Sequence, residues 1–222
     1  MAIKVTMTSS MRCIFCKRDS AGSRSVEHII PESLGNTTAL LRAGIVCDKC
    51  NNYFAQNVEK PFLEAEALRA LRFHRALPSK KGRIPPLAAL LLPEYPVTIY
   101  RNVKEGKFAG VIDVESEGAR HLLSAREARI LFPPHKVAPE HSTVSRFLAK
   151  VGIEAMAQRV VDMPGGIEYL TDEKQLDLIR RFAREGFPKQ WPQWRAESMT
   201  QIAVSRTPPA RRSRQFGNMT SL

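Results

Sequence analysis

The order of apolar and polar positions predicts strands first and helices afterwards in the N-terminal part of the chain. Residues 24–30 are expected to be a strand that ends at Pro31, and residues 40–46 form an apolar run that leads into the second cysteine pair. From Asp48 onward the apolar residues recur at helical spacing. The same spacing, with a proline suited to a first turn, predicts a helix over residues 61–77.

The C-terminal part shows the same change of pattern. Residues 97–100 and 108–114 are rich in β-branched and aromatic side chains, and the polar run 104–107 between them is typical of a hairpin turn. Apolar stripes then predict helices over 144–161 and 171–185. The chain is therefore expected to belong to the α+β class.

These elements divide the chain into segments. A cysteine-containing domain is expected over residues 11–77, followed by a proline-rich linker over 78–96 and an α+β domain over 97–204. Residues 205–222 carry several arginines and no acid, which predicts a disordered basic tail.

Composition narrows the class of protein. Hydrophobic residues make up 43% of the chain and charged residues 25%, which are globular values. No apolar run reaches the roughly 20 residues of a membrane span, and the N-terminus lacks the apolar stretch of a signal peptide. We therefore expect a cytoplasmic protein with no membrane partner. The net charge of +12 favours a polyanionic partner such as nucleic acid.

The four cysteines form two pairs, Cys13-x-x-Cys16 and Cys47-x-x-Cys50, with none left over. This spacing is typical of a tetrahedral thiolate zinc site, and in a reducing compartment cysteines are more often metal ligands than disulfides. Four thiolates close the coordination shell, so the zinc is expected to be structural. The alternative is two pairs unrelated to metal.

Between the two pairs lie Glu27 and His28, and Asn51 directly follows the last cysteine. A histidine of near-neutral pKa suits a general base. A carboxylate with an amide oxygen suits a hard ion such as Mg²⁺. Neighbouring strand residues point to opposite faces, so Glu27 and His28 would share one target only where the strand ends. Together these residues predict a hydrolytic centre.

The pattern Cys-x-x-Cys, Glu-His-Ile-Ile-Pro-Glu-Ser-Leu-Gly, Cys-Asp-Lys-Cys-Asn-Asn-Tyr-Phe resembles the HNH endonucleases of the ββα-metal (His-Me finger) superfamily. It is most similar to the members with a four-cysteine zinc site, such as phage endonuclease VII. The resemblance covers about residues 11–60. It implies a zinc-stapled treble-clef ββα-metal core and a nuclease that acts on DNA, with RNA left open. Such nucleases occur in mobile elements and in phage defence.

The resemblance also implies roles for individual residues. His28 would be the general base, and Glu27 with Asn51 would hold one catalytic Mg²⁺ or Mn²⁺, leaving 5′-phosphate and 3′-hydroxyl ends. Glu27 departs from the aspartate of many members. The family's middle asparagine is missing just before Cys47, so Asn36 is the candidate for fixing the His28 loop, and Asn52 is a rival to Asn51 as ligand.

Arginines supply candidate nucleic-acid contacts, and a row of this kind also occurs as a plain solvated surface. The candidates are Arg69, Arg72 and Arg75 at helical spacing, and Arg211, Arg212 and Arg214 in the tail. Two other functions stay open: a nuclease subunit activated by a protein partner, and a zinc module that binds nucleic acid without cutting it.

Overall fold

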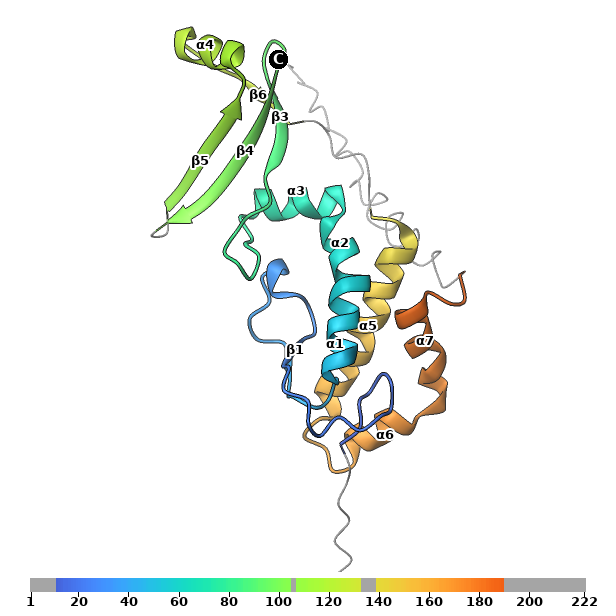
Figure 1. Ribbon diagram of the computed structural model, residues 1–222. Helices are drawn as coiled ribbons and strands as arrows, with labels where there is room; N and C mark the ends of the chain where they lie inside the picture. The colour runs from blue at the N-terminus through green and yellow to red at the C-terminus, as the bar shows by residue number, and fades with distance from the viewer. Residues whose placement is uncertain (1–10, 105–106, 133–138, 190–222) are drawn as a thin grey trace, which may run out of the picture. The chain divides into compact units, whose positions relative to one another are not determined.

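The computed structural model describes residues 11–104, 107–132 and 139–189, and its N-terminal part has the order strand, strand, helix (Figure 1). Strand β1 (Glu27–His28) pairs antiparallel with β2 (Leu40–Leu41). A 3₁₀ turn, η1 (Glu32–Leu34), lies between them, and helix α1 (Asp48–Phe54) follows. The strand expected over residues 24–30 is shorter than predicted, because only Glu27 and His28 pair with β2, which lies at the start of the apolar run 40–46.

The helix continues from α1 through a π-helical turn, η2 (Ala55–Glu59), into α2 (Lys60–Glu64). A second helix, α3 (Glu66–His74), follows after a break. The expected single helix over 61–77 is thus two helices. The break lies at Ala65, whose ψ of 139° is extended and interrupts the run of helical backbone.

A four-stranded antiparallel sheet follows, with the order β5-β4-β3-β6 (Figure 1). Its strands are β3 (Leu87–Leu91), β4 (Tyr95–Lys104), β5 (Lys107–Val114) and β6 (Ile130–Leu131), and α4 (Ser116–Ser124) lies between the last two. The expected hairpin is present. The segment predicted to be a linker instead contains β3, whose alternating buried residues pack with Ala70 and Phe73 of α3.

The described C-terminal part is helical. It contains α5 (His141–Val160), α6 (Gly166–Asp172), the 3₁₀ turn η3 (Lys174–Leu176) and α7 (Asp177–Glu185). The helix expected over 171–185 is therefore three short elements, since Glu173 has an extended ψ of 109°. Gly186 ends α7 in the left-handed conformation, with φ of 69°.

Two apolar clusters hold these elements. In the first, Ile14, Leu41 and Phe54 pack with Phe147 and Ile153 of α5 and with residues of α6 and α7. In the second, α3 packs on the sheet. We expected residues 97–204 to form one domain. The apolar clusters instead join α5–α7 to the cysteine-containing segment, because that segment is too small to bury an apolar core alone.

The α+β class is confirmed by the helices and antiparallel sheets. Within the described ranges, no helix is long and apolar enough to cross a membrane. The predicted basic tail, with Arg211, Arg212 and Arg214, lies outside the described residues.

Candidate active site and metal centre

The four cysteine sulfurs lie in one cluster and all fall within 4.8 Å of one another. Sγ of Cys16 is 3.7 Å from Sγ of Cys47, close to the roughly 3.8 Å that tetrahedral Zn–S bonds of about 2.3 Å require. Backbone amides of Cys47 and Cys50 donate to the sulfurs of Cys13 and Cys47, each at 3.4 Å, as in thiolate metal knuckles. The free cysteines can therefore hold a metal ion such as zinc.

Helix α7 supports this cluster with two arginines. Nη1 of Arg184 donates to Sγ of Cys50 at 2.9 Å, and its guanidinium lies over the Tyr53 ring. Arg180 is 3% exposed and donates from Nε to the carbonyl of Ile14, inside the first cysteine pair, at 2.7 Å. The second pair opens α1, where Cys47 is the N-cap.

Strand β1 and helix α1 bring His28 and Asn51 to the same cavity, which has a volume of about 720 Å³. Asp48, in the first turn of α1, accepts backbone hydrogen bonds from Arg24 and Ser25 just before the strand, at 2.9–3.3 Å. The side-chain hydrogen bond of Ser25, together with these backbone bonds, lowers the pKa of Asp48 below its usual value. Asp48 thus fixes the approach of β1 to α1, which carries Asn51. The rival Asn52 is exposed and does not line the cavity.

Asn36 closes the loop that follows His28. Its amide nitrogen donates to the carbonyls of Ile30 and Ala39 at 2.7 and 3.0 Å. Its amide oxygen accepts from the backbone nitrogens of Thr38 and Ala39 at 3.2 and 2.9 Å. Asn36 makes the bonds that a loop-fixing residue requires, and its importance for catalysis stays a prediction.

Glu27 also lines the cavity, and its carboxylate forms an ion pair with Lys150, a buried lysine of α5. Nζ of Lys150 lies 2.6 Å from Oε1 of Glu27, 2.6 Å from Oε1 of Glu59 and 2.9 Å from Oε2 of Glu154. It also donates to the carbonyl of His28 at 3.2 Å. Lys150 and Glu154 are fully buried and Glu27 is 4% exposed. A single ammonium therefore links the strand, η2 and α5.

Three carboxylates around one ammonium leave negative charge in a buried place, and the titration of these groups shifts accordingly. Burial raises the pKa of Glu27, against the opposing pull of Lys150. Burial also raises the pKa of Glu154 well above its usual value, which favours its neutral form. The pKa of Lys150 is raised as well, because the three carboxylates outweigh its burial. The lysine is therefore the firmly charged member of the cluster.

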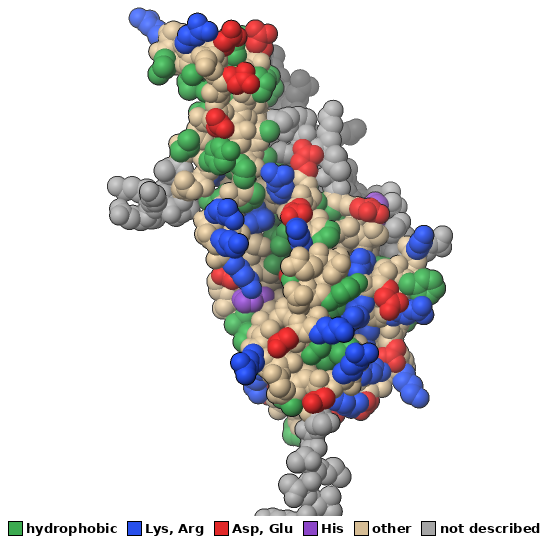
Figure 2. Space-filling model, viewed as in Figure 1, with side chains coloured by type: hydrophobic (Ala, Val, Ile, Leu, Met, Phe, Trp, Pro, Cys, Tyr) green, Lys and Arg blue, Asp and Glu red, His purple; other side chains and the backbone are tan. Residues whose placement is uncertain are grey.

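The arginine row on α3 is divided by the structure. Arg72 is 8% exposed and lines the cavity of His28, whereas Arg69 and Arg75 are exposed and line none of the described cavities. On the face of the molecule that Figure 2 shows, Lys and Arg side chains lie next to a histidine. The walls of the His28 cavity also include Lys60, Lys80, Lys81 and Arg83. The nucleic-acid role of Arg69 and Arg75 stays a prediction.

Sequence reasoning missed Lys150, Glu59 and Glu154. A signal was present for two of them. Lys150 and Glu154 are four apart on a helix and fall on the same stripe as Phe147 and Ala157, where an apolar residue is expected. A charged pair at core positions indicates a buried partner, although the sequence does not say which.

The fold and site thus define a strand–strand–helix unit with four clustered cysteines that can hold a metal ion, and with a histidine and an asparagine in one cavity. Residues 13–65 match the model of an HNH endonuclease family. This confirms the resemblance to HNH endonucleases, and the four clustered cysteines agree with the zinc-containing subset. Neither curated proteins nor solved structures gave a match to this chain.

Proposed function

We propose that this protein is a divalent-metal-dependent HNH endonuclease that hydrolyses phosphodiester bonds of DNA, with His28 as the general base. One observation carries the proposal: within the segment that matches the HNH family, His28 and Asn51 line a single cavity whose walls carry five lysine and arginine side chains. That combination suits a phosphate ester and a water molecule to be activated. A cytoplasmic location remains our expectation.

The imidazole of His28 would take a proton from water, and the resulting hydroxide would attack phosphorus. The bond from phosphorus to the 3′ oxygen then breaks with its electron pair on oxygen, and this oxygen takes a proton from solvent water, which leaves 5′-phosphate and 3′-hydroxyl ends. His28 is half-buried, so it reaches the cavity while its own backbone carbonyl is held by Lys150. Holding the strand in this way keeps the base in one position relative to α1.

The donor set in the cavity fits a hard divalent ion. Asn51 offers an amide oxygen, and Glu27 offers the carboxylate oxygen that Lys150 does not bind. When bound, Mg²⁺ or Mn²⁺ would stabilise negative charge on the phosphate and on the leaving oxygen. Because Lys150 occupies one oxygen of Glu27, this side chain could offer the ion only its other oxygen. The amide oxygen of Asn51 and an oxygen of the substrate phosphate would be the further ligands.

The test is cleavage of supercoiled plasmid by wild type and His28→Ala at equal zinc content, with Mg²⁺, with Mn²⁺ and without either ion. We expect ion-dependent nicking in wild type and a loss of about 10²-fold or more in His28→Ala, the usual contribution of a general base. Cutting that survives in His28→Ala would refute the assignment of the base.

Binding without cutting has two explanations, and one further measurement separates them. Addition of a co-encoded protein that restores cutting would favour the partner-activated subunit. Binding that never leads to cutting, with or without such a protein, would favour the zinc module without catalysis.

A further inference from the structure

Arg72 is a buried cation without a visible counter-charge. It is 8% exposed, and among the described residues its Nε atom has no hydrogen-bond partner and its guanidinium has no ion pair. Burial, and then the neighbouring Arg69, lower its pKa. A charge removed from water without a partner destabilises a fold, so the location of Arg72 calls for a ligand.

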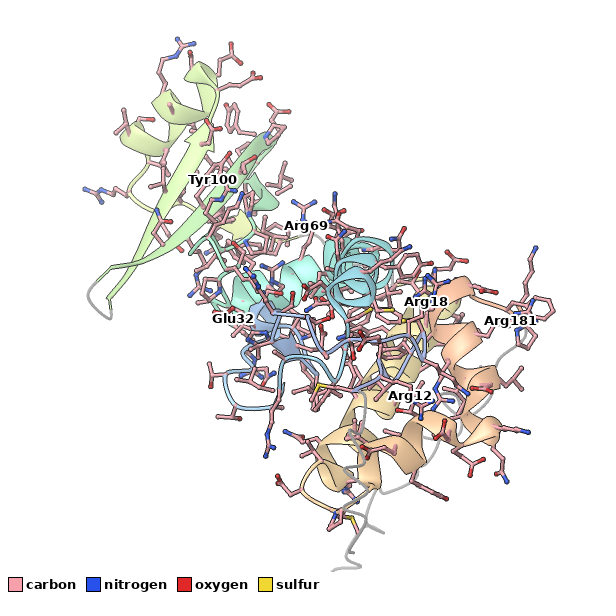
Figure 3. All side chains as sticks on the ribbon, turned by 60° about the horizontal axis from the view of Figure 1, so that its bottom comes forward. Arg12, Arg18, Glu32, Arg69, Tyr100 and Arg181 are labelled. Atoms are coloured by element: carbon pink, nitrogen blue, oxygen red, sulfur yellow. The ribbon has the colours of Figure 1, made fainter. Side chains whose placement is uncertain are left out.

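Arg72 lies where two cavities meet. Together with Ser79 and Arg83 it lines the cavity of His28 and also a second cavity of about 570 Å³ on the sheet side. The second cavity is further lined by Tyr100 of β4 and Val111 of β5, which are cross-strand partners and are 41% and 55% exposed. In Figure 3, Tyr100 lies on the sheet and Arg69, a neighbour of Arg72 in the chain, lies on α3.

The loop beside Arg72 is a closed turn. The backbone nitrogen of Ser79 donates to the carbonyl of Arg83 at 2.8 Å, and that of Gly82 donates to the carbonyl of Ser79 at 2.8 Å. Gly82 takes a φ of 72°, which suits glycine at such a turn. The turn holds Lys80, Lys81 and Arg83 at the wall of the cavity that Arg72 also lines.

We propose that Arg72, with Ser79 and Arg83, binds a phosphate of the substrate backbone next to the scissile one and directs the strand onto the sheet at Tyr100. A guanidinium fork matches the oxygens of a phosphate, and a phosphate would supply the missing counter-charge. The tyrosine ring offers a surface on which a base can stack. This inference rests on the proposed nuclease function and assigns the sheet a part in substrate binding.

The experiment measures binding without cleavage, so it does not depend on the chemical step. A fluorescein-labelled DNA duplex with a single-stranded overhang is titrated with the His28→Ala protein in zinc-containing buffer without Mg²⁺, across a range of NaCl concentrations. The variants Arg72→Met and Arg159→Met are made in this background. Arg159 is an exposed arginine of α5 that lines none of the described cavities, so it is the charge-matched control.

For Arg72→Met we expect Kd to rise about 10-fold and the slope of log Kd against log salt to fall by about one phosphate contact. Arg159→Met should change Kd by less than about 2-fold. The Tm of Arg72→Met should equal or exceed that of its parent, because an unpaired buried charge is removed. Tyr100→Ala should weaken binding by about 5-fold or more, whereas Tyr100→Phe keeps the ring and should bind as the parent does.

Unchanged affinity and salt slope in Arg72→Met would overturn the inference even if wild type cuts DNA. A Tm several degrees below that of the parent would also overturn it, since Arg72 would then be a structural residue. Equal losses in Arg72→Met and Arg159→Met would show only general charge attraction and would count against a site. A wild type that never cuts would refute the proposed function while leaving this binding result readable.

Discussion

Nζ of Lys150 lies 2.6 Å from Oε1 of Glu27, although 123 residues separate them in the chain. The same ammonium donates to the carbonyl of His28, so one side chain of α5 holds both residues of β1. The helix outside the matched segment is therefore part of what positions the candidate base. The small cysteine-containing segment gains from α5 contacts that fix β1, which its own apolar residues cannot provide.

Replacing Lys150 by methionine should destabilise the protein strongly. The change leaves three carboxylates around a buried space without a cation, and removing one partner of such a cluster costs about 3–5 kcal/mol of the free energy of unfolding. Urea denaturation measures this loss. Lys174→Met, at an exposed lysine in the η3 turn, should cost less than about 0.5 kcal/mol. A similar small loss in both variants would contradict the proposed importance of Lys150.

A second change should partly reverse the first. Glu27→Gln in the Lys150→Met background removes one of the uncompensated charges, so the double variant should be more stable than the sum of the two single losses predicts. The expected coupling is about 1–3 kcal/mol, measured by a double-mutant cycle in urea. Strict additivity would show that the 2.6 Å contact does not couple the two residues energetically.

Glu154→Gln should change how stability depends on pH. The raised pKa of Glu154 means that the folded state binds its proton more tightly than the unfolded state does. The contribution of Glu154 to the free energy of unfolding is therefore complete below the ordinary carboxyl pKa of about 4.3, and it is lost as pH rises above that value. The amide does not titrate. The free energy of unfolding of the variant relative to wild type should thus rise between about pH 4 and pH 8, by at most about 1.4 kcal/mol per pH unit.

The other members of the cluster do not reproduce that difference. The pKa of Lys150 is also raised, but its contribution is present below the ordinary lysine pKa of about 10.4 and is lost only at higher pH. Glu27 is present in both proteins, so its own raised pKa affects both curves in the same direction. Stability curves that run parallel from pH 4 to pH 8 would show that Glu154 does not titrate abnormally.

The local part of the site was predictable from the sequence. The two CxxC spacings predicted that the four cysteines cluster. His28 between the pairs and Asn51 directly after Cys50 were predicted to lie near one another, and they line one cavity. This proximity was predictable because it depends on short-range geometry, since Asn51 follows Cys50 on α1, whereas the catalytic roles stay predictions. The hairpin of β4 and β5 was predictable for the same reason.

The long-range part was not predictable. Nothing in the periodicity says that Lys150 reaches Glu27, or that α5–α7 pack on the cysteine-containing segment rather than on the sheet, because one apolar stripe fits several partners. The arginine row gives a related example. Helical spacing put Arg69, Arg72 and Arg75 near one face, but only the tertiary packing buries Arg72 and leaves its neighbours exposed.

Arg184→Met should weaken zinc binding. Arg184 donates to Sγ of Cys50 at 2.9 Å, and hydrogen bonds to the ligands of a metal typically contribute 10- to 100-fold in affinity, so we expect a loss of about 10-fold. Competition with a chromophoric zinc chelator measures it. Arg181→Met, at an exposed arginine of the same helix that pairs with Glu185, is the control and should keep the affinity of wild type. Equal affinities for zinc in both variants would contradict the role of Arg184.

Asn36→Ala should slow cleavage without weakening DNA binding, because it removes four loop hydrogen bonds beside His28 while taking no group from the cavity wall. Its free energy of unfolding should fall by about 1–3 kcal/mol. Asn36→Asp keeps the two bonds accepted from Thr38 and Ala39 and loses the two donated ones, so its turnover number should lie between those of wild type and Asn36→Ala. Asn57→Ala removes a single bond to Tyr53 and should leave the turnover number unchanged. A turnover number of Asn36→Ala equal to that of wild type would mean that β1 and its turn hold His28 in place without this loop.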